Sequence, residues 1–218
     1  MIAQWFSRSD ASLLLVARNQ DKLEETRALC EPDAQSRIEI LSHDLAVDPI
    51  QPTTFSEPFA SPSILVSVAG SFLFKTLENT TREEYQQQFD VNLFTCVNLV
   101  KSFLPSLKKH QQNRIIAIDS IAATVGLGDS GAYASSKHAL LGYLRSLREE
   151  LRQEPIPVTS IHLGQTYSTS WASSDMDPAK LINPWDVAQT IYTIACLSPQ
   201  TSVDELTIMP SGGPVAPF

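Results

Sequence analysis

The sequence has little cysteine, and its cysteines are not arranged for disulfides or for a metal. There are three, Cys30, Cys96 and Cys196, and they lie far apart in apolar segments of helical period. An odd number at such spacing favours reduced thiols in a protein core over disulfides or zinc ligands. We therefore expect a cytoplasmic protein without a metal site.

Long apolar runs and basic clusters are also missing. No stretch is apolar over the length of a membrane-spanning helix, and Met1 to Arg8 lack the pattern of a secretory signal. The formal net charge is −8, and no run of Lys and Arg exceeds Lys108-Lys109. Binding to nucleic acid needs a basic surface, so we expect neither a nucleic-acid nor a membrane partner.

Internal repeats and low-complexity tracts are absent as well. The chain has 218 residues, of which 43% are hydrophobic. This is enough for one sizeable core but leaves little room for a second. We expect a single domain that covers residues 1–218.

The residues that are present alternate between short apolar runs and longer segments of helical period. The apolar runs lack polar residues at alternate positions, so both faces of each strand should be covered. This order predicts an α/β fold with a doubly wound parallel sheet between two helical layers, the Rossmann-like arrangement. The predicted strands are Ser12–Ala17, Ile38–Leu41, Ile64–Val68, Arg114–Ile118, Val158–His162 and Leu206–Met209, and the predicted helices are Asp21–Cys30, Thr81–Lys109, Gly131–Gln153 and Pro184–Leu197.

Three of the predicted helices begin with capping residues. Asn19 precedes the first, Thr81 stands before two glutamates at the second, and Asn183 is followed by a proline at the fourth. Such side chains accept a hydrogen bond from the first helical turn. We expect these three helix starts to be sharply defined.

Ser120, Tyr133 and Lys137 form the most informative group of polar residues. Tyr133 and Lys137 are four residues apart in a predicted helix and share one of its faces. A nearby ammonium lowers the pKa of a tyrosine from its ordinary value of about 10. Ser120 follows a strand, where ligands bind in an open α/β sheet. The alternative is a tyrosine and a lysine on a solvated helix face, which this context disfavours.

Asn92 falls on the apolar stripe of the helix predicted from Thr81. A buried amide needs hydrogen-bond partners. Asn92 is therefore either a structural residue bonded to neighbouring backbone or a residue of the functional site, and its spacing leaves both open.

These residues together resemble the short-chain dehydrogenase/reductase family. The similarity runs from about Ile2 to Met209 and rests on Tyr133-Ala-Ser-Ser-Lys137 with Ser120, on Asn92 within Asp-Val-Asn-Leu, and on Val68-Ala69-Gly70 after a strand. The resemblance implies an NAD(P)-dependent oxidoreductase that acts on a small carbonyl or alcohol and assembles as a homodimer or homotetramer.

The resemblance also implies roles for individual residues. Tyr133 would be the general acid/base, Lys137 would lower its pKa and hold the nicotinamide ribose, Ser120 would orient the substrate carbonyl, and Asn92 would support a water relay. The resemblance implies further cofactor contacts besides Tyr133 and Lys137. Asp44 and Leu45 would meet the adenine, and Ala69 and Gly70 follow the third strand. Gly164, Thr166 and Ser168 would lie near the nicotinamide amide and the phosphates.

Arg18 indicates which cofactor is used. It follows Ser12–Ala17, where NAD-preferring relatives carry an acid that holds the ribose hydroxyls. An arginine at this position suits the 2′-phosphate of NADP, so we expect NADP(H). The alternative is an ordinary surface cation.

The family's first strand and glycine-rich turn have no counterpart before Ile2–Phe6, which read as a helix without a capping residue. In the family this turn presents backbone N–H groups to the cofactor pyrophosphate. We expect a gap between Ser12–Ala17 and Ile64–Val68, and a fuller form of the protein with an upstream strand and turn.

The string Gly126-Leu-Gly128-Asp-Ser-Gly131 has the spacing of a dinucleotide-binding loop but does not directly follow a strand, so we expect a flexible connection there. Two functions other than an NADP(H)-dependent oxidoreductase stay open. One is a catalytically silent relative that acts as a binding or scaffold protein. The other is a hydrolase that uses Ser130, although the βα alternation does not suit a serine protease.

Overall fold

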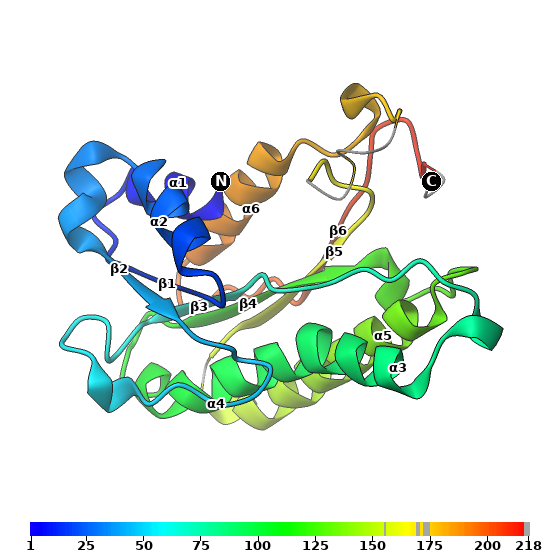
Figure 1. Ribbon diagram of the computed structural model, residues 1–218. Helices are drawn as coiled ribbons and strands as arrows, with labels where there is room; N and C mark the ends of the chain where they lie inside the picture. The colour runs from blue at the N-terminus through cyan, green and yellow to red at the C-terminus, as the bar shows by residue number, and fades with distance from the viewer. Residues whose placement is uncertain (155, 169–170, 172–174, 216–218) are drawn as a thin grey trace.

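The structure is a computed structural model that describes residues 1–154, 156–168, 171 and 175–215. Its strands pair in parallel, and helices cover both faces (Figure 1). This is the predicted three-layer, Rossmann-like fold, in which each crossover returns the chain to begin the next parallel strand. The strands are β1 (Leu13–Ala17), β2 (Ile38–Ser42), β3 (Ile64–Ser67), β4 (Arg114–Ser120), β5 (Val158–Leu163) and β6 (Glu205–Ile208), and the helices are α1 (Ile2–Ser7), α2 (Gln20–Ala28), α3 (Arg82–Phe89), α4 (Thr95–Leu107), α5 (Gly131–Glu150) and α6 (Pro184–Ala195).

The strands form two separate sheets. One consists of β1 and β2, and the other has the order β3-β4-β5-β6. No backbone pairing joins β1 to β3 within the described residues, so the predicted gap between these strands is confirmed. The chain winds outward in opposite directions from this gap, which makes it the switch point at which ligands bind in such folds.

Side chains connect the two sheets where the backbone does not. Leu14 and Val16 of β1 pack against the apolar cluster that contains Leu65 of β3. On the opposite face, Leu13 and Ile64 pack against a second cluster. The two sheets are therefore held together by apolar packing, without the hydrogen-bond ladder that joins neighbouring strands elsewhere.

Two helical layers enclose the sheets (Figure 1). Helices α3, α4 and α5 lie below them in this view, and α1, α2 and α6 lie above. Side chains alternate along β4. Ile115 and Ala117 join the cluster between the sheet and helices α4 and α5, whereas Ile116 and Ile118 join the cluster between the sheet and α6. Each face of the sheet therefore has its own core.

The helix predicted over Thr81–Lys109 is interrupted, and the prediction of one continuous helix was wrong. Between α3 and α4 the chain forms a π-helical turn, Asp90–Phe94, which contains Asn92. Such turns insert an extra residue into a helix and are frequent at functional sites. The other predicted bounds differ from the observed ones by at most two residues, except that Leu151–Gln153 form a 3₁₀ turn after α5.

The three predicted helix starts are confirmed. Asn19 and Asn183 each accept a hydrogen bond from the first turn of their helix, and Thr81 forms a capping box with Glu84. All three cysteines are free, as predicted, but only Cys30 and Cys96 are buried. Cys196 is exposed because it lies at the C-cap of α6, so its assignment to the core was wrong. In the part of the chain that the structure describes, every helix is too short or too polar to span a membrane.

Candidate active site

The predicted site residues gather along one edge of the two sheets. This edge is where parallel strands all end, so residues far apart in the sequence meet there. The residues at or just beyond the strand ends are Arg18 after β1, Asp44 after β2, Ala69 and Gly70 after β3, Ser120 at the end of β4, and Gly164 after β5.

Ser120, Tyr133 and Lys137 meet where the start of α5 packs against the end of β4. Lys137 is buried, and its Nζ lies 3.3 Å from the carbonyl oxygen of Ile118. Ser120 is also buried and its side chain hydrogen-bonds that of Tyr133. The structure therefore places Ser120 beside Tyr133, with Lys137 one helical turn further along α5 and against the end of β4.

The pKa of Tyr133 is raised above its ordinary value, chiefly by burial, and the charge of Asp119 raises it further, while the hydrogen bond from Ser120 lowers it. Lys137, which the resemblance implies would lower this pKa, is not among the groups that shift it in this structure. The reason is geometric: the ammonium of Lys137 lies against Ile118 and 3.9 Å from Asp119 Oδ1. Burial in turn lowers the pKa of Lys137, which Asp119 partly offsets.

Asn92 is buried in the π-helical turn and joins three segments. Its Oδ1 accepts a hydrogen bond from the backbone N–H of Ser71 at 2.8 Å, and its Nδ2 lies 3.0 Å from the carbonyl oxygen of Ser71. The same nitrogen lies 2.9 Å from Ser136 Oγ and 3.1 Å from Gln88 Oε1. Asn92 thus ties the loop after β3 to α5, beside Lys137.

Gly70 lies where the loop after β3 packs against Asn92 and Lys137. A Cβ atom at this position would come within 3.3 Å of Asn92 Oδ1 and 3.8 Å of Lys137 Nζ. The absence of a side chain therefore leaves the space beside the ammonium open. Ala69 is exposed next to it.

Arg18 and Asp44 form the opposite end of the site, at the ends of β1 and β2. They lie 3.9 Å apart as an exposed ion pair, with 68% of the Arg18 side chain accessible. Leu45 points away, because its side chain joins the core and its carbonyl accepts a hydrogen bond from Asn98. Only the backbone of Leu45 is therefore available for the predicted adenine contact.

Gly164 and Thr166 follow β5. A Cβ at Gly164 would come within 2.9 Å of Met209 Sδ and 3.0 Å of Pro210 Cδ, so close packing against the end of β6 explains this glycine. Thr166 Oγ1 donates to the carbonyl oxygen of Gly164 at 3.1 Å. Thr166 therefore lies just beyond the end of β5, and its hydroxyl already donates a hydrogen bond within the same loop.

The profile described as short chain dehydrogenase matches residues 1–179. The chain belongs to the short-chain dehydrogenase family. An uncharacterized oxidoreductase of Bacillus subtilis, YusZ, is 30% identical over 166 residues, which cover 74% of this chain and 59% of that protein. An uncharacterized oxidoreductase of Staphylococcus epidermidis is 25% identical over 213 residues, covering 96% of this chain and 90% of the relative.

Solved structures of similar proteins share the fold. An NADPH-bound short-chain oxidoreductase from Pseudomonas aeruginosa with an atypical catalytic center has a TM-score of 0.85 at 21% identity, covering 99% of this chain and 92% of that one. A metagenomic short-chain oxidoreductase in complex with NADP has a TM-score of 0.77 at 25% identity, covering 96% and 90%. The recognised resemblance and the fold class are therefore confirmed.

Two residues beside Tyr133 in this short-chain dehydrogenase were not predicted from its sequence. The ring of Phe72 meets that of Tyr133 edge to face at a centroid distance of 4.9 Å, and Phe74 stacks on Phe72 at 6.5 Å. Both phenylalanines are exposed. The signal was the apolar run Phe72-Leu-Phe74, two residues after Gly70, at a strand end where a polar loop is usual.

The glycine string before α5 has a different role from the one that its spacing suggests. Gly131 begins α5 and packs so tightly that a Cβ there would fall 1.9 Å from Leu77 Cδ2, which explains the glycine at this position. Ser130 is buried, and its hydroxyl has no hydrogen-bond partner among the described residues. A nucleophile needs a base within reach, so this geometry gives the hydrolase no support.

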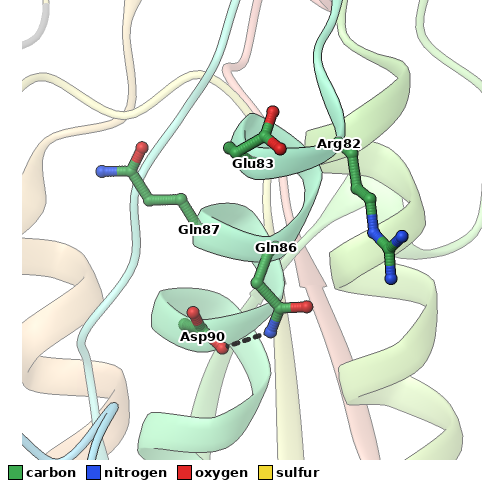
Figure 2. Close-up of a pocket in the computed structure, with 5 residues that line it drawn as sticks. All are labelled: Arg82, Glu83, Gln86, Gln87 and Asp90. Carbon is green, nitrogen blue, oxygen red and sulfur yellow. Dashed lines mark hydrogen bonds between the residues drawn. The ribbon is translucent and has the colours of Figure 1, made fainter.

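A shallow polar pocket lies elsewhere, on the outer side of α3 (Figure 2). It is lined by Arg82, Glu83, Gln86, Gln87 and Asp90, and Gln86 Nε2 donates to Asp90 Oδ1 at 2.7 Å. Its residues are one exposed helix face with an i,i+4 pair. None of the predicted site residues lines it.

Proposed function

We propose that this short-chain dehydrogenase is an NADP(H)-dependent oxidoreductase. It would transfer a hydride between the nicotinamide and a small carbonyl or alcohol, with Tyr133 as the general acid/base. The observation that carries this proposal is the meeting of Ser120, Tyr133 and Lys137 at the carboxyl end of β4. These three side chains come from two elements, and only the packing of α5 on β4 joins them.

The residues of the chain support proton transfer in the direction of carbonyl reduction. A tyrosine whose pKa is raised by burial keeps its proton near neutral pH and can donate it. Ser120, hydrogen-bonded to Tyr133, can hold the substrate oxygen next to that hydroxyl. As hydride reaches the carbonyl carbon, the Tyr133 proton passes to the carbonyl oxygen. The carbonyl becomes an alcohol, and Tyr133 is left as a phenolate.

The nicotinamide cofactor supplies the hydride when it is bound. Gly70 has no side chain to stand between the loop after β3 and Lys137 Nζ, so a ribose hydroxyl would approach the ammonium from that side. Exposed Arg18 offers a guanidinium for a 2′-phosphate, and Asp44 and the backbone of Leu45 lie beside it for the adenine. Ala69 follows β3, which lies between these two ends, and Gly164 and Thr166 follow β5, on the far side of β4. The residues present therefore fit both ends of NADP(H).

The decisive experiment combines NADPH oxidation, followed by absorbance, with Tyr133→Phe. We expect turnover of a panel of small aldehydes and ketones by the unmodified protein, and a loss of at least about 100-fold in kcat in the variant, because general acid–base groups contribute about 10²–10⁴-fold. Tyr143→Phe is a matched control, since it lies about 15 Å further along α5. A Tyr133→Phe variant that folds and keeps more than about a tenth of the activity would exclude the acid/base role.

A second function is favoured by the gap between β1 and β3. The dinucleotide of this family crosses the sheet edge at the switch point, and here no backbone pairing holds the two sides together in the described chain. A catalytically silent binding protein is the function that follows if the gap prevents cofactor binding. Titration with NADPH, followed by nicotinamide fluorescence, separates the two: micromolar binding supports the oxidoreductase, and no binding at millimolar NADPH supports the silent relative.

A further inference from the structure

A row of ionisable side chains crosses the face of the sheet that packs against α4 and α5 and that carries the apolar cluster with Leu65 and Val158. Asp119 of β4 lies directly opposite His162 of β5 in the strand register. Glu205 of β6 lies next to His162 on the same face. Side chains of neighbouring strands on one face lie side by side, so the three groups form a continuous row. Buried polar groups in an apolar core need a reason.

Asp119 connects this row to the proposed active site. Its Oδ1 accepts a hydrogen bond from the backbone N–H of Ser120 at 2.9 Å and lies 3.9 Å from Lys137 Nζ. The Asp119 side chain is fully buried, and only 5% of the Lys137 side chain is exposed. A buried ammonium is strongly unfavourable without an anion nearby, and Asp119 is that anion.

His162 lies on the other side of Asp119. Its Nδ1 is 3.7 Å from Asp119 Oδ2, and its Nε2 is 3.5 Å from Glu205 Oε2. In the described part of the chain, neither ring nitrogen nor Asp119 Oδ2 has a hydrogen-bond partner. Glu205 accepts two hydrogen bonds from Arg145, at 2.7 and 2.9 Å, at the surface. The row therefore runs from Lys137 at the site to the outside of the molecule.

We propose that Asp119 is a positioning residue of this active site, whose carboxylate, held between His162 and Lys137, fixes the ammonium group of Lys137 at the carboxyl end of β4, against the carbonyl oxygen of Ile118. The proposal rests on the proposed function, in which Lys137 acts next to Tyr133 and the cofactor ribose. Asp119 touches neither substrate nor cofactor in this arrangement. Its effect on the reaction passes through Lys137 and through its charge.

The electrostatics of the surrounding groups agree with this role. The titratable groups that face the pair are Cys96 of α4 around Lys137, and Tyr133 of α5 and His162 of β5 around Asp119. Glu205, Arg145 and Arg148 lie beyond His162. Burial lowers the pKa of Lys137 and the charge of Asp119 raises it again. The same charge raises the pKa of Tyr133. Removal of the negative charge at Asp119 therefore lowers the pKa of Lys137 and the pKa of Tyr133.

Asp119→Asn tests the proposal because it removes the charge and keeps an oxygen that can accept the Ser120 N–H. The first measurement is the ionisation of Tyr133, followed as phenolate absorbance and corrected with the same protein carrying Tyr133→Phe, which needs no turnover. We expect this ionisation to move to lower pH. The basic limb of the pH profile for NADPH-dependent carbonyl reduction should move in the same direction.

Asp204→Asn is the matched control. It makes the same chemical change at a carboxylate that is 58% exposed and lies 3.7 Å from Arg148, one residue before Glu205. Salt and water screen such a charge, so the ionisation of Tyr133 should stay where it is in the unmodified protein.

A Tyr133 ionisation in Asp119→Asn that coincides with that in Asp204→Asn overturns the proposal, whatever the activity. Absence of turnover in the unmodified protein contradicts the proposed function instead, and the titration still decides about Asp119. If circular dichroism shows that Asp119→Asn does not fold, Asp119→Ser removes the same charge and is measured in the same way, with the same outcomes.

Discussion

Lys137 is a buried charged side chain of the proposed site, and three neighbours surround its ammonium group. Its Nζ donates to the carbonyl oxygen of Ile118 and lies near Asp119, and the narrow space at Gly70 borders it on a third side. An ammonium suits such a site because it is a compact point charge, whereas the wider guanidinium of an arginine needs more space. The position of the charge is thus set by the backbone of β4 as much as by Lys137 itself.

The predicted preference for NADP(H) over NAD(H) rests on Arg18. Its guanidinium is largely exposed and pairs only loosely with Asp44, so it is free to bind a 2′-phosphate. Arg18→Ala should weaken NADPH binding by about 10- to 100-fold, the size expected for one or two charge-assisted hydrogen bonds, and should leave NADH binding nearly unchanged. Fluorescence titration with both cofactors measures this.

Arg27→Ala is a suitable control for this measurement, because Arg27 is another arginine in a loose ion pair, with Glu24 at 3.9 Å, and lies within α2. It should change neither affinity. Equal losses of NADPH and NADH binding in Arg18→Ala would show that Arg18 does not read the 2′-phosphate.

At the scale of elements, the start of α3 organises the loops around Tyr133. Thr81 and Glu84 form the capping box, and Glu84 also accepts hydrogen bonds from Lys75 Nζ at 2.7 and 2.9 Å. The backbone N–H of Lys75 donates to the carbonyl oxygen of Asp129, just before α5. One helix start therefore links the loop that carries Phe72 to the loop that leads into Tyr133.

Loss of this cap should be measurable as a loss of stability. Thr81→Ala removes the oxygen that accepts the Glu84 N–H, and we expect the free energy of unfolding in urea to fall by about 1 kcal/mol, within a usual range of about 0.5–2 kcal/mol. Thr81→Ser keeps the hydroxyl and should retain most of the stability. A Thr81→Ala variant as stable as the unmodified protein would show that the box contributes nothing to folding.

At the scale of the whole molecule, the separation of the two sheets has a measurable consequence. β1 and β3 lie in the interior of the strand order, yet each pairs on one side only among the described residues. Their remaining backbone groups lack a ladder partner, as in edge strands. In hydrogen exchange, we expect amides of β1 and β3 to be protected about as weakly as those of the outer strands β2 and β6, and far less than those of β4 and β5.

Protection in β1 and β3 that matches the protection in β4 would show that these two strands are joined in solution by hydrogen bonds. Addition of NADPH in the same experiment shows whether the cofactor brings the two sheets together, since a ligand bound across both would slow exchange in β1 and β3 first.

The homo-oligomer remains a prediction. The apolar stripes of α4 and α5 on which it was based pack mostly inside the chain, against the sheet, and include Val100, Phe103, Leu140 and Leu144. Phe94 is the large apolar residue of the π-helical turn that is exposed. Light scattering at micromolar concentration should give the mass of a dimer or tetramer. Monomer alone at that concentration contradicts the prediction.

Much of this protein was determined by the sequence alone. The alternation of apolar runs and helical segments was sufficient for the parallel α/β fold, because a buried parallel strand tolerates few polar residues. The caps at Asn19, Thr81 and Asn183 were legible because a cap is a contact between residues close in the chain. The grouping of Tyr133 with Lys137 was legible for the same reason, since four residues span one helical turn.

The tertiary structure alone decided which distant groups meet. The sequence contains Asp119 and His162 without any sign that they are partners, because their contact follows from the register of β4 on β5. It also predicted that Lys137 would lower the pKa of Tyr133, whereas the packing of α5 directs the ammonium to Ile118 and Asp119. Sequence patterns report local spacing, but the electrostatics of a buried site depend on burial and on charges brought in by other strands.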